Sequence, residues 1–216
     1  MTTRRTPKLD KKQVVETALR LLNEVGLDGL TLRAIAKELD VQAPALYWHF
    51  KDKQELLDEM ATEMYRRMTA QVRLAPHTAW QERLLARNRS LRAALLGYRD
   101  GAKVFSGSRF TGTGHAVQLE ADLRALVDAG FTLPRAVRAL STAYSFTIGF
   151  VTEEQGVEPV PGDRREGYDV TERAARLAEF PLAAAAGAGL FQEYDEGFEE
   201  GLALLVQGIE ARYGLA

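Results

Sequence analysis

Residues 31–53 read TLRAIAKELDVQAPALYWHFKDK, and this stretch decides the fold. Its apolar residues recur three and four positions apart, which predicts two short helices, 32–39 and 43–49, joined by a tight turn. Thr31 is a suitable N-cap for the first helix, and Pro44 falls in the first turn of the second, where a missing N–H costs nothing. Two short helices joined in this way are typical of a helix-turn-helix that reads DNA in the major groove.

The second helix of this motif carries three large rings in a row, Tyr47, Trp48 and His49. A small domain normally buries such rings, so their exposure would favour contacts with thymine methyl groups and phosphates; the alternative is that Tyr47 or Trp48 caps the domain core. Arg33 can bind guanine through two hydrogen bonds or lie solvated, and Lys53 can contact a phosphate at the start of the next helix. The residues predicted to face DNA are Arg33, Ala43, Pro44, Ala45, Tyr47, Trp48, His49 and Lys53.

The rest of the chain is also predicted to be helical, because no segment alternates apolar and polar residues at a spacing of two. Asp10 with Gln13, Asp52 with Glu55, and Thr78 with Gln81 have the spacing of helix caps, and a break is expected near Pro76. Further helices are expected at 11–25, 53–71, 79–96, 100–106, 116–129, 134–154, 181–192 and 196–213. The sequence thus predicts an all-α chain of about ten helices, with a three-helix DNA-binding domain at 1–52, a connecting helix at 53–75 and a larger helical domain at 76–216.

Charge and composition limit the classes of function. Residues 1–53 contain ten Lys and Arg against seven Asp and Glu, a net charge of +3, whereas the remainder has a net charge of −5. A basic head on an acidic body suits a protein that touches a polyanion at one end. There is no cysteine for a disulfide or thiolate site, and no stretch is apolar enough to span a membrane. We therefore expect no membrane partner, and a cytoplasmic protein that is nucleoid-associated when bound to DNA.

An enzyme is the main alternative class. The three histidines, His49, His77 and His115, lie far apart in the sequence, and neither a glycine-rich phosphate loop nor a nucleophile signature is found. We expect no catalytic residue, no metal site and no cofactor. A second alternative is a DNA-binding regulator without small-molecule control, which a fully packed regulatory core would favour.

Residues 31–53 resemble the DNA-binding domain of the tetracycline repressor (TetR) family. The resemblance continues through GYRDGAKV at 97–104 and from GFTL at 130–133 up to Gly149, and it covers nearly the whole chain. It implies a homodimeric transcriptional repressor that binds palindromic, double-stranded operator DNA and is released by a small-molecule effector. By the same resemblance, helices 134–154 and 196–213 form a four-helix bundle between subunits. Effector binding would shift the helix at 53–71, so that the two heads no longer match successive major grooves.

The resemblance also locates an effector pocket in each subunit, where this sequence departs from the family. In the tetracycline-binding class, histidine and asparagine side chains hold a magnesium–drug chelate, and their positions here hold Thr69, Arg87 and Phe105. Phenylalanine has no lone pair for a metal and arginine accepts no hydrogen bond, so these residues cannot repeat the chelate contacts. A drug-contacting glutamine is matched here by Asp122, and an aromatic wall by Leu91.

Glu153 matches an acidic residue that reaches over from the partner subunit, but one carboxylate does not make a metal site. We therefore expect an effector other than magnesium–tetracycline, aromatic or polycyclic, with an anionic or hydrogen-bonding edge. The residues predicted to bind it are Thr69, Arg87, Leu91, Phe105, Ser108, Arg109, Phe110, Asp122 and Glu153. The alternative for each of these residues is that it belongs to the ordinary core or surface and does not contact an effector.

Overall fold

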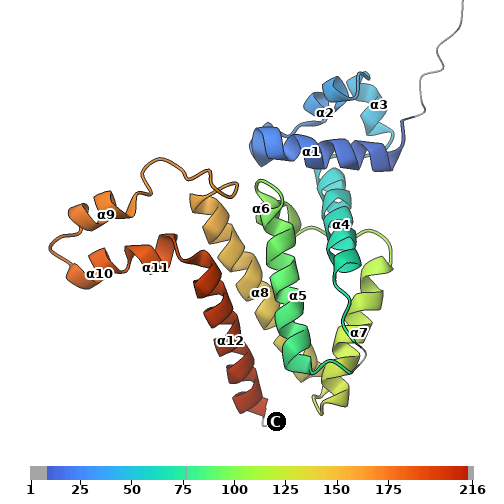
Figure 1. Ribbon diagram of the computed structural model, residues 1–216. Coiled ribbons are helices and arrows are strands. Elements are labelled where there is room, and N and C mark those ends of the chain that lie inside the picture. Colours follow the sequence, from blue (N-terminus) through green and yellow to red (C-terminus); the bar gives the residue numbers. More distant parts are fainter. Residues whose placement is uncertain (1–8, 76, 214–216) are drawn as a thin grey trace, which may run out of the picture.

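The computed structural model describes residues 9–75 and 77–213, and within them the chain forms twelve helices and no strand (Figure 1). The helices are α1 (Lys11–Gly29), α2 (Leu32–Glu38), α3 (Ala43–Tyr47), α4 (Lys53–Gln71), α5 (Trp80–Leu96), α6 (Gly101–Phe105), α7 (Gly114–Asp128), α8 (Leu133–Val157), α9 (Val170–Arg176), α10 (Pro181–Ala185), α11 (Gly187–Phe191) and α12 (Tyr194–Tyr213). Helices α1–α3 form a head, α4 runs from the head into a body of α5–α8 and α12, and α9–α11 project from the body as an arm. The all-α prediction is confirmed.

Side-chain N-caps stabilise the start of three helices: α1 and α2 of the head, and α4, which connects the head to the body. Asp10 accepts a hydrogen bond from the Gln13 N–H at 2.7 Å, Thr31 from the Ala34 N–H at 3.1 Å, and Asp52 from the Glu55 N–H at 2.8 Å. Each bond satisfies a backbone donor that has no partner within its helix. These polar residues therefore fix where the helices of the DNA-reading motif begin.

Three expectations about helix limits are wrong. The arm contains α9, which we did not predict, although Asp169 caps it by accepting from two backbone N–H groups. The single helix expected at 181–192 is two short helices, because its small residues offer almost no apolar face to pack. Thr78 does not cap α5: its hydroxyl donates to the Ala75 carbonyl at 2.9 Å, and the cap residue is Ala79. The break expected near Pro76 lies outside the described residues.

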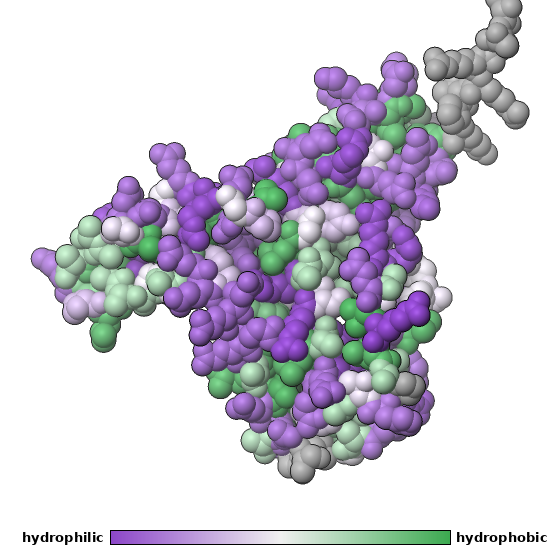
Figure 2. Space-filling model, in the orientation of Figure 1, coloured by the Kyte–Doolittle hydropathy of each residue, from purple (hydrophilic) through white to green (hydrophobic). Residues whose placement is uncertain are grey.

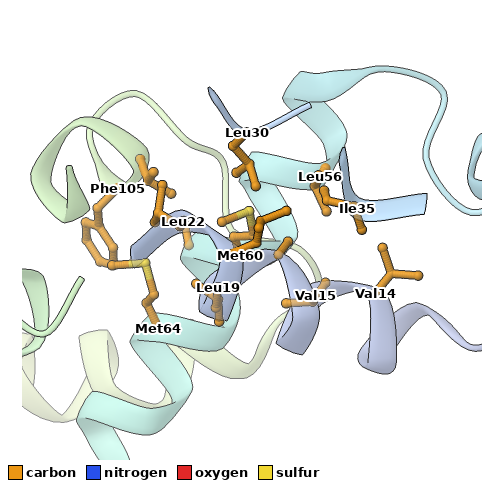
Figure 3. Packing of buried hydrophobic residues seen from close by; sticks show 14 of the residues in the cluster. Val14, Val15, Leu19, Leu22, Leu30, Ile35, Leu56, Met60, Met64 and Phe105 are labelled. Atoms are coloured by element: carbon orange, nitrogen blue, oxygen red, sulfur yellow. The ribbon is translucent and has the colours of Figure 1, made fainter. Parts of the chain in front are cut away.

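A single hydrophobic cluster joins the head to the body. Leu56, Met60 and Met64 of α4 lie in the same buried cluster as Leu22 of α1 and Phe105 of α6 (Figure 3). Because protein interiors are close-packed, α4 cannot move against α6 without repacking its contact with α1. The helix is thus a mechanical connection between the head and the interior of the body.

A polar joint reinforces this connection at the end of α1. Asp100, at a left-handed φ of 56°, accepts hydrogen bonds from the Leu27 N–H at 3.0 Å and from Lys103 at 2.8 Å. Burial by itself would raise the pKa of the Asp100 carboxyl, but these hydrogen bonds outweigh it and hold the pKa below its ordinary value. The Arg99 N–H also donates to the Asn23 side chain at 2.8 Å. The α5–α6 turn is therefore bonded directly to the head.

The α5–α6 turn is closed from the inside by Gln155, a buried residue of α8. Its amide donates to the carbonyls of Leu95 and Tyr98 at 3.2 and 2.8 Å and accepts from the Ala102 N–H at 3.0 Å. A Cβ added to Gly101 would overlap the Leu95 carbonyl oxygen. The turn therefore requires glycine at position 101.

We expect Gly101→Ala to lower the free energy of unfolding by about 2 kcal/mol, because the added methyl group must displace backbone. The matched control is Gly156→Ala in α8, where a Cβ meets no atom within 4 Å. Because alanine favours helix more than glycine does, the control should be neutral or slightly stabilising. Urea denaturation followed by circular dichroism measures both, and equal effects would contradict the overlap.

Candidate DNA interface and effector cavity

The turn of the helix-turn-helix positions α3 against α2. Asp40 takes a left-handed φ of 53°, and the Val41 N–H donates back to the Ala36 carbonyl at 3.0 Å. Aspartate tolerates this backbone region better than most residues, because its short side chain can form hydrogen bonds with the neighbouring backbone. Ile35 and Leu46 are completely buried between the helices and set their spacing.

The rings at the end of α3 and in the turn after it are divided between solvent and core. Tyr47 is 58% exposed and Trp48 is 89% exposed, whereas Leu46 and Phe50 are fully buried. The Phe50 N–H donates to the Leu46 carbonyl at 2.9 Å in the turn after α3, and this turn brings Phe50 back to the core while Tyr47 and Trp48 stay exposed. The alternative in which Tyr47 or Trp48 caps the core is wrong, because Phe50 fills that place.

The other residues predicted to face DNA differ in exposure. Arg33, Pro44 and Lys53 are exposed, whereas Ala43, Ala45 and His49 are only partly so. Ala43 packs against the core cluster of the head. The Lys53 ammonium donates to the Leu27 carbonyl at 2.9 Å, which ties the start of α4 to the end of α1 and leaves two of its donors for another partner.

A cavity of about 390 Å³ lies in the body, between α4, α5, α7 and α8. This is the size range of small-molecule sites, and most of its wall is apolar or aromatic. The lining residues are Tyr65, Met68, Leu84, Arg87, Asn88, Leu91, Phe105, Phe110, His115, Gln118, Leu119, Asp122, Leu123, Val137, Leu140, Ser141 and Tyr144.

The structure brings five of the predicted effector residues together in this lining: Arg87, Leu91, Phe105, Phe110 and Asp122. Sequence reasoning missed the rest of the wall. Tyr65 and Met68 carry a detectable signal, because each lies four positions after a buried residue of the same helix, Ala61 and Met64 respectively. The lining contributed by α7 and α8 follows only from how these helices cross α5.

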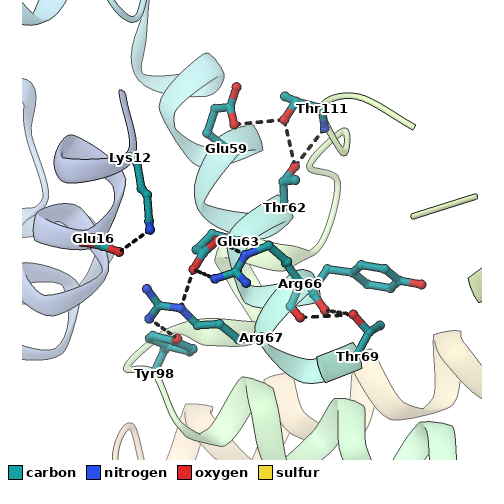
Figure 4. Close-up of polar contacts among 11 residues, drawn as sticks. Lys12, Glu16, Glu59, Thr62, Glu63, Arg66, Arg67, Thr69, Tyr98 and Thr111 are labelled. Carbon is teal, nitrogen blue, oxygen red and sulfur yellow. Dashed lines mark hydrogen bonds and ion pairs between the residues drawn. The ribbon is translucent and has the colours of Figure 1, made fainter. Parts of the chain in front are cut away.

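Four predicted effector residues lie away from the cavity wall, which corrects their assignment within this subunit. The Thr69 hydroxyl donates to the Tyr65 and Arg66 carbonyls of its own helix, at 3.0 and 3.1 Å (Figure 4). Ser108 likewise donates to the Val104 carbonyl at 2.6 Å.

Arg109 is exposed in the loop after α6, and its backbone N–H donates to the Asp58 carboxylate at 3.0 Å. Glu153 is exposed on α8 and faces away from the cavity of its own chain. Both side chains are long, and a sequence position alone does not determine where such a chain points.

One end of the cavity is aromatic. Phe110 lies against three rings, with centroid distances of 4.8 Å to Tyr65, 5.4 Å to Phe105 and 5.5 Å to His115. Burial raises the pKa of the Tyr65 phenol above its ordinary value, so the phenol stays neutral and available as a hydrogen-bond donor. This end of the cavity suits a planar ring system.

Charged side chains also line the cavity. One oxygen of Asp122 faces the Arg83 and Arg87 guanidiniums, each at 3.4 Å, and accepts from the Gln118 amide at 2.9 Å. Two guanidiniums thus share one carboxylate. Arg83 Nε, Arg87 Nη1 and His115 Nδ1 are buried without a hydrogen-bond partner. Such groups are costly to leave unpaired.

The head and the cavity together define a helix-turn-helix protein with a chamber for a small ligand. The family model "Bacterial regulatory proteins, tetR family" matches residues 14–60, and "Tetracyclin repressor-like, C-terminal domain" matches residues 74–213. The chain therefore belongs to the tetracycline repressor family of ligand-responsive transcriptional repressors. Members of this family are regulators rather than enzymes, so the enzyme alternative is set aside.

Individual relatives agree with this assignment. The chain is 42% identical over 209 residues to tetracycline repressor protein class A from transposon 1721 of Escherichia coli. The alignment covers 95% of this chain and 92% of that protein. A possible TetR family regulator from Streptomyces coelicolor A3(2) superimposes with a TM-score of 0.81 at 38% identity, covering 94% and 99% of the two chains.

Two further solved structures contain bound molecules. A TetR variant from Acinetobacter baumannii AYE in complex with minocycline is 36% identical, with a TM-score of 0.73 and coverage of 94% and 98%. BioQ with its double-stranded DNA operator is 30% identical, with a TM-score of 0.62 and coverage of 94% and 99%. In the part of the chain that the structure describes, no helix is both long and apolar enough to cross a membrane.

Proposed function

We propose that the chain represses transcription as a homodimer that places α3 of each head in the major groove of a palindromic operator, and that an effector bound in the cavity releases it. The observation that carries this proposal is the pair of exposed rings, Tyr47 and Trp48, beside the buried Phe50. Exposing two large rings to water is unfavourable, so we expect that a partner molecule covers them. The minocycline and operator complexes of the two relatives support both halves of the proposal.

Operator contacts are assigned to one surface of the head. Phosphates position the head, and Lys53 has free donors for one of them, whereas base edges are read by α3 and by Arg33. The full set is Arg33, Ala43, Pro44, Ala45, Tyr47, Trp48, His49 and Lys53. We divide the chain into a DNA-binding domain at 1–52, a connecting helix at 53–75 and an effector-binding and dimerisation domain at 76–216.

We expect Arg33→Ala to weaken operator binding by about 1–3 kcal/mol and to relax the preference at one base pair. Arg33 is exposed near the start of α2, where a guanidinium can form two bonds to guanine. Fluorescence anisotropy at fixed salt measures binding to the operator and to a set of single-base variants. An equal loss on every sequence would mean instead that Arg33 contacts a phosphate.

The dimer is assigned to α8 and α12. Phe146 of α8 stacks on Phe198 of α12, with centroids 5.6 Å apart, which fixes the two helices together. On the outside, Leu204 stays exposed and lies with Leu205 and Gly208 along a hollow between the helices. An apolar outer stripe on a helix pair suits a two-fold contact with the same stripe of a second copy. In that dimer, Glu153 faces the partner subunit.

The effector is proposed to be an aromatic or polycyclic molecule without magnesium. Magnesium prefers several carboxylate and water oxygens, whereas Asp122, the one carboxylate among the described lining residues, already faces two arginines. No group of three His, Cys, Asp or Glu side chains forms a metal site among the described residues. A regulator without small-molecule control would need no chamber of about 390 Å³, and such a chamber favours control by a ligand.

Operator release tests this function. The protein on its selected operator is challenged with tetracycline plus magnesium and, separately, with a panel of metal-free polycyclic aromatic compounds. We expect release by a metal-free aromatic and none by magnesium–tetracycline. Release by magnesium–tetracycline would contradict the reading of Arg87 and Phe105 as incompatible with the chelate, and failure to bind any selected DNA would reject the repressor itself.

A further inference from the structure

A second hollow adjoins the effector cavity on the other side of the Arg87 side chain. It is a cleft of about 580 Å³ between α5, α7 and the segment after α4, and it shares Arg87 and Gln118 with the cavity. Its wall contains four arginines against a single carboxylate, Asp128. The lining residues are Val72, Arg73, Leu74, Arg83, Arg87, Gln118, Ala121, Arg124, Ala125 and Asp128. Asp122 pairs with Arg83 and Arg87, and Glu120 pairs with Arg124, so the cleft that borders the cavity is rich in arginine and moderately basic.

The boundary between the two hollows carries an unbalanced buried charge. The side chains of Arg83 and Arg87 are only 10% and 14% exposed, and both pair with the same oxygen of Asp122. One carboxylate neutralises one guanidinium, so a net charge of +1 remains within this triad. Arg83 Nε and Arg87 Nη1 also lack any hydrogen-bond partner. A buried charge of this kind is unfavourable until an anion accepts its free N–H groups.

The two hollows have complementary chemistry. On one side of Arg87 lies the ring-lined chamber formed by Tyr65, Phe110 and His115, and on the other lies the basic cleft with Arg73 and Arg124. A wholly apolar ligand would fill the first and leave the guanidinium donors unpaired. A small inorganic anion would pair with the guanidiniums and leave the apolar chamber empty.

We propose that the effector is an amphiphilic organic anion, whose aromatic body fills the cavity and whose carboxylate, sulfonate or phosphate binds Arg87 at the boundary with the basic cleft. This rests on the proposed function and specifies its ligand. Arg87 selects the anion because its free Nη1 forms a charge-assisted hydrogen bond. Arg73, which is exposed and lines the cleft, attracts the same charge from solvent.

Two matched fluorescent probes test the proposal. Anilinonaphthalene sulfonate has an aromatic body and one anionic group, and phenylnaphthylamine has the same rings and amine without the sulfonate. Both become fluorescent in apolar cavities, so direct titration gives their dissociation constants. We expect the sulfonate probe to bind about tenfold more tightly or better, as a charge-assisted hydrogen bond predicts. Arg87→Gln should remove this preference while leaving the neutral probe unchanged, and Arg87→Lys should restore part of it.

Controls separate the binding of the anion from folding and from binding elsewhere. Arg109→Gln removes an exposed arginine outside the cavity and should leave the preference intact. Leu119→Trp at the cavity wall should weaken both probes, and if it changes neither probe, the cavity does not hold them. Equal affinity of the two probes, or equal weakening of both by Arg87→Gln, would overturn the proposal. Operator binding measured on the same samples without probe reports the repressor function independently, because it requires no ligand.

Discussion

Asp122→Asn lowers the free energy of unfolding by about 3–5 kcal/mol, the expected cost of leaving a buried charge without its partner. The native carboxylate is buried and faces Arg83 and Arg87, each at 3.4 Å. Asparagine keeps the size of the side chain and its bond from Gln118, so the variant changes charge and little else. The two guanidiniums then repel one another in a site with little water. Urea denaturation at a fixed protein concentration measures the loss, since the stability of a dimer depends on concentration.

The same helix supplies the matched control. Glu120 pairs with Arg124 at 2.9 Å on the surface of α7, where the two side chains are 69% and 66% exposed. Glu120→Gln breaks an ion pair by an identical chemical change, but in water, and should cost no more than about 0.5 kcal/mol. If Asp122→Asn cost as little, solvent entering from the basic cleft would already screen the arginines. The excess charge at the boundary would then have no measurable effect on the free energy of unfolding.

Much of the fold could be predicted from the sequence because the relevant signals are local. The cap residues Asp10, Thr31 and Asp52 act within one helical turn, and the limits of α4 are those predicted. Prediction failed in the arm, where small residues provide almost no periodic apolar face. The helix count rose from ten to twelve there, since α9 was missed and one expected helix is divided.

The cavity could be predicted only in part because it is built from tertiary contacts. Arg83 and Asp122 meet although 39 residues separate them, and no local pattern indicates that pairing. Resemblance to the family placed Arg87, Phe105 and Asp122 in the wall because these positions point inward on their helices. It placed Thr69 there too, but that hydroxyl bonds to its own helix instead.

The rings at the end of α3 show why the sequence alone could not predict which large side chains of the DNA-reading motif are exposed and which are buried. Tyr47, Trp48 and Phe50 are all large aromatic residues and nearly adjacent, so residue type does not distinguish an exposed ring from a buried one. The structure buries Phe50 completely and exposes Trp48. This distinction depends on where α3 ends, at Tyr47, and on the turn that carries Phe50 back to the core.

Alanine substitutions of these rings should therefore have opposite consequences. Phe50→Ala opens a cavity among fully buried neighbours such as Leu46 and Leu56 and is expected to cost about 3–5 kcal/mol of stability, with operator binding lost because the head unfolds. Trp48→Ala should leave stability within about 0.5 kcal/mol. It should nevertheless weaken operator binding by about 2 kcal/mol, as for an aromatic anchor of an interface, and Tyr47→Ala should act in the same direction. Thermal melting and operator anisotropy on the same preparations separate the two effects. A Trp48→Ala protein that melts early would show that the ring supports the fold, and one that binds its operator normally would show that DNA covers a different face of the head.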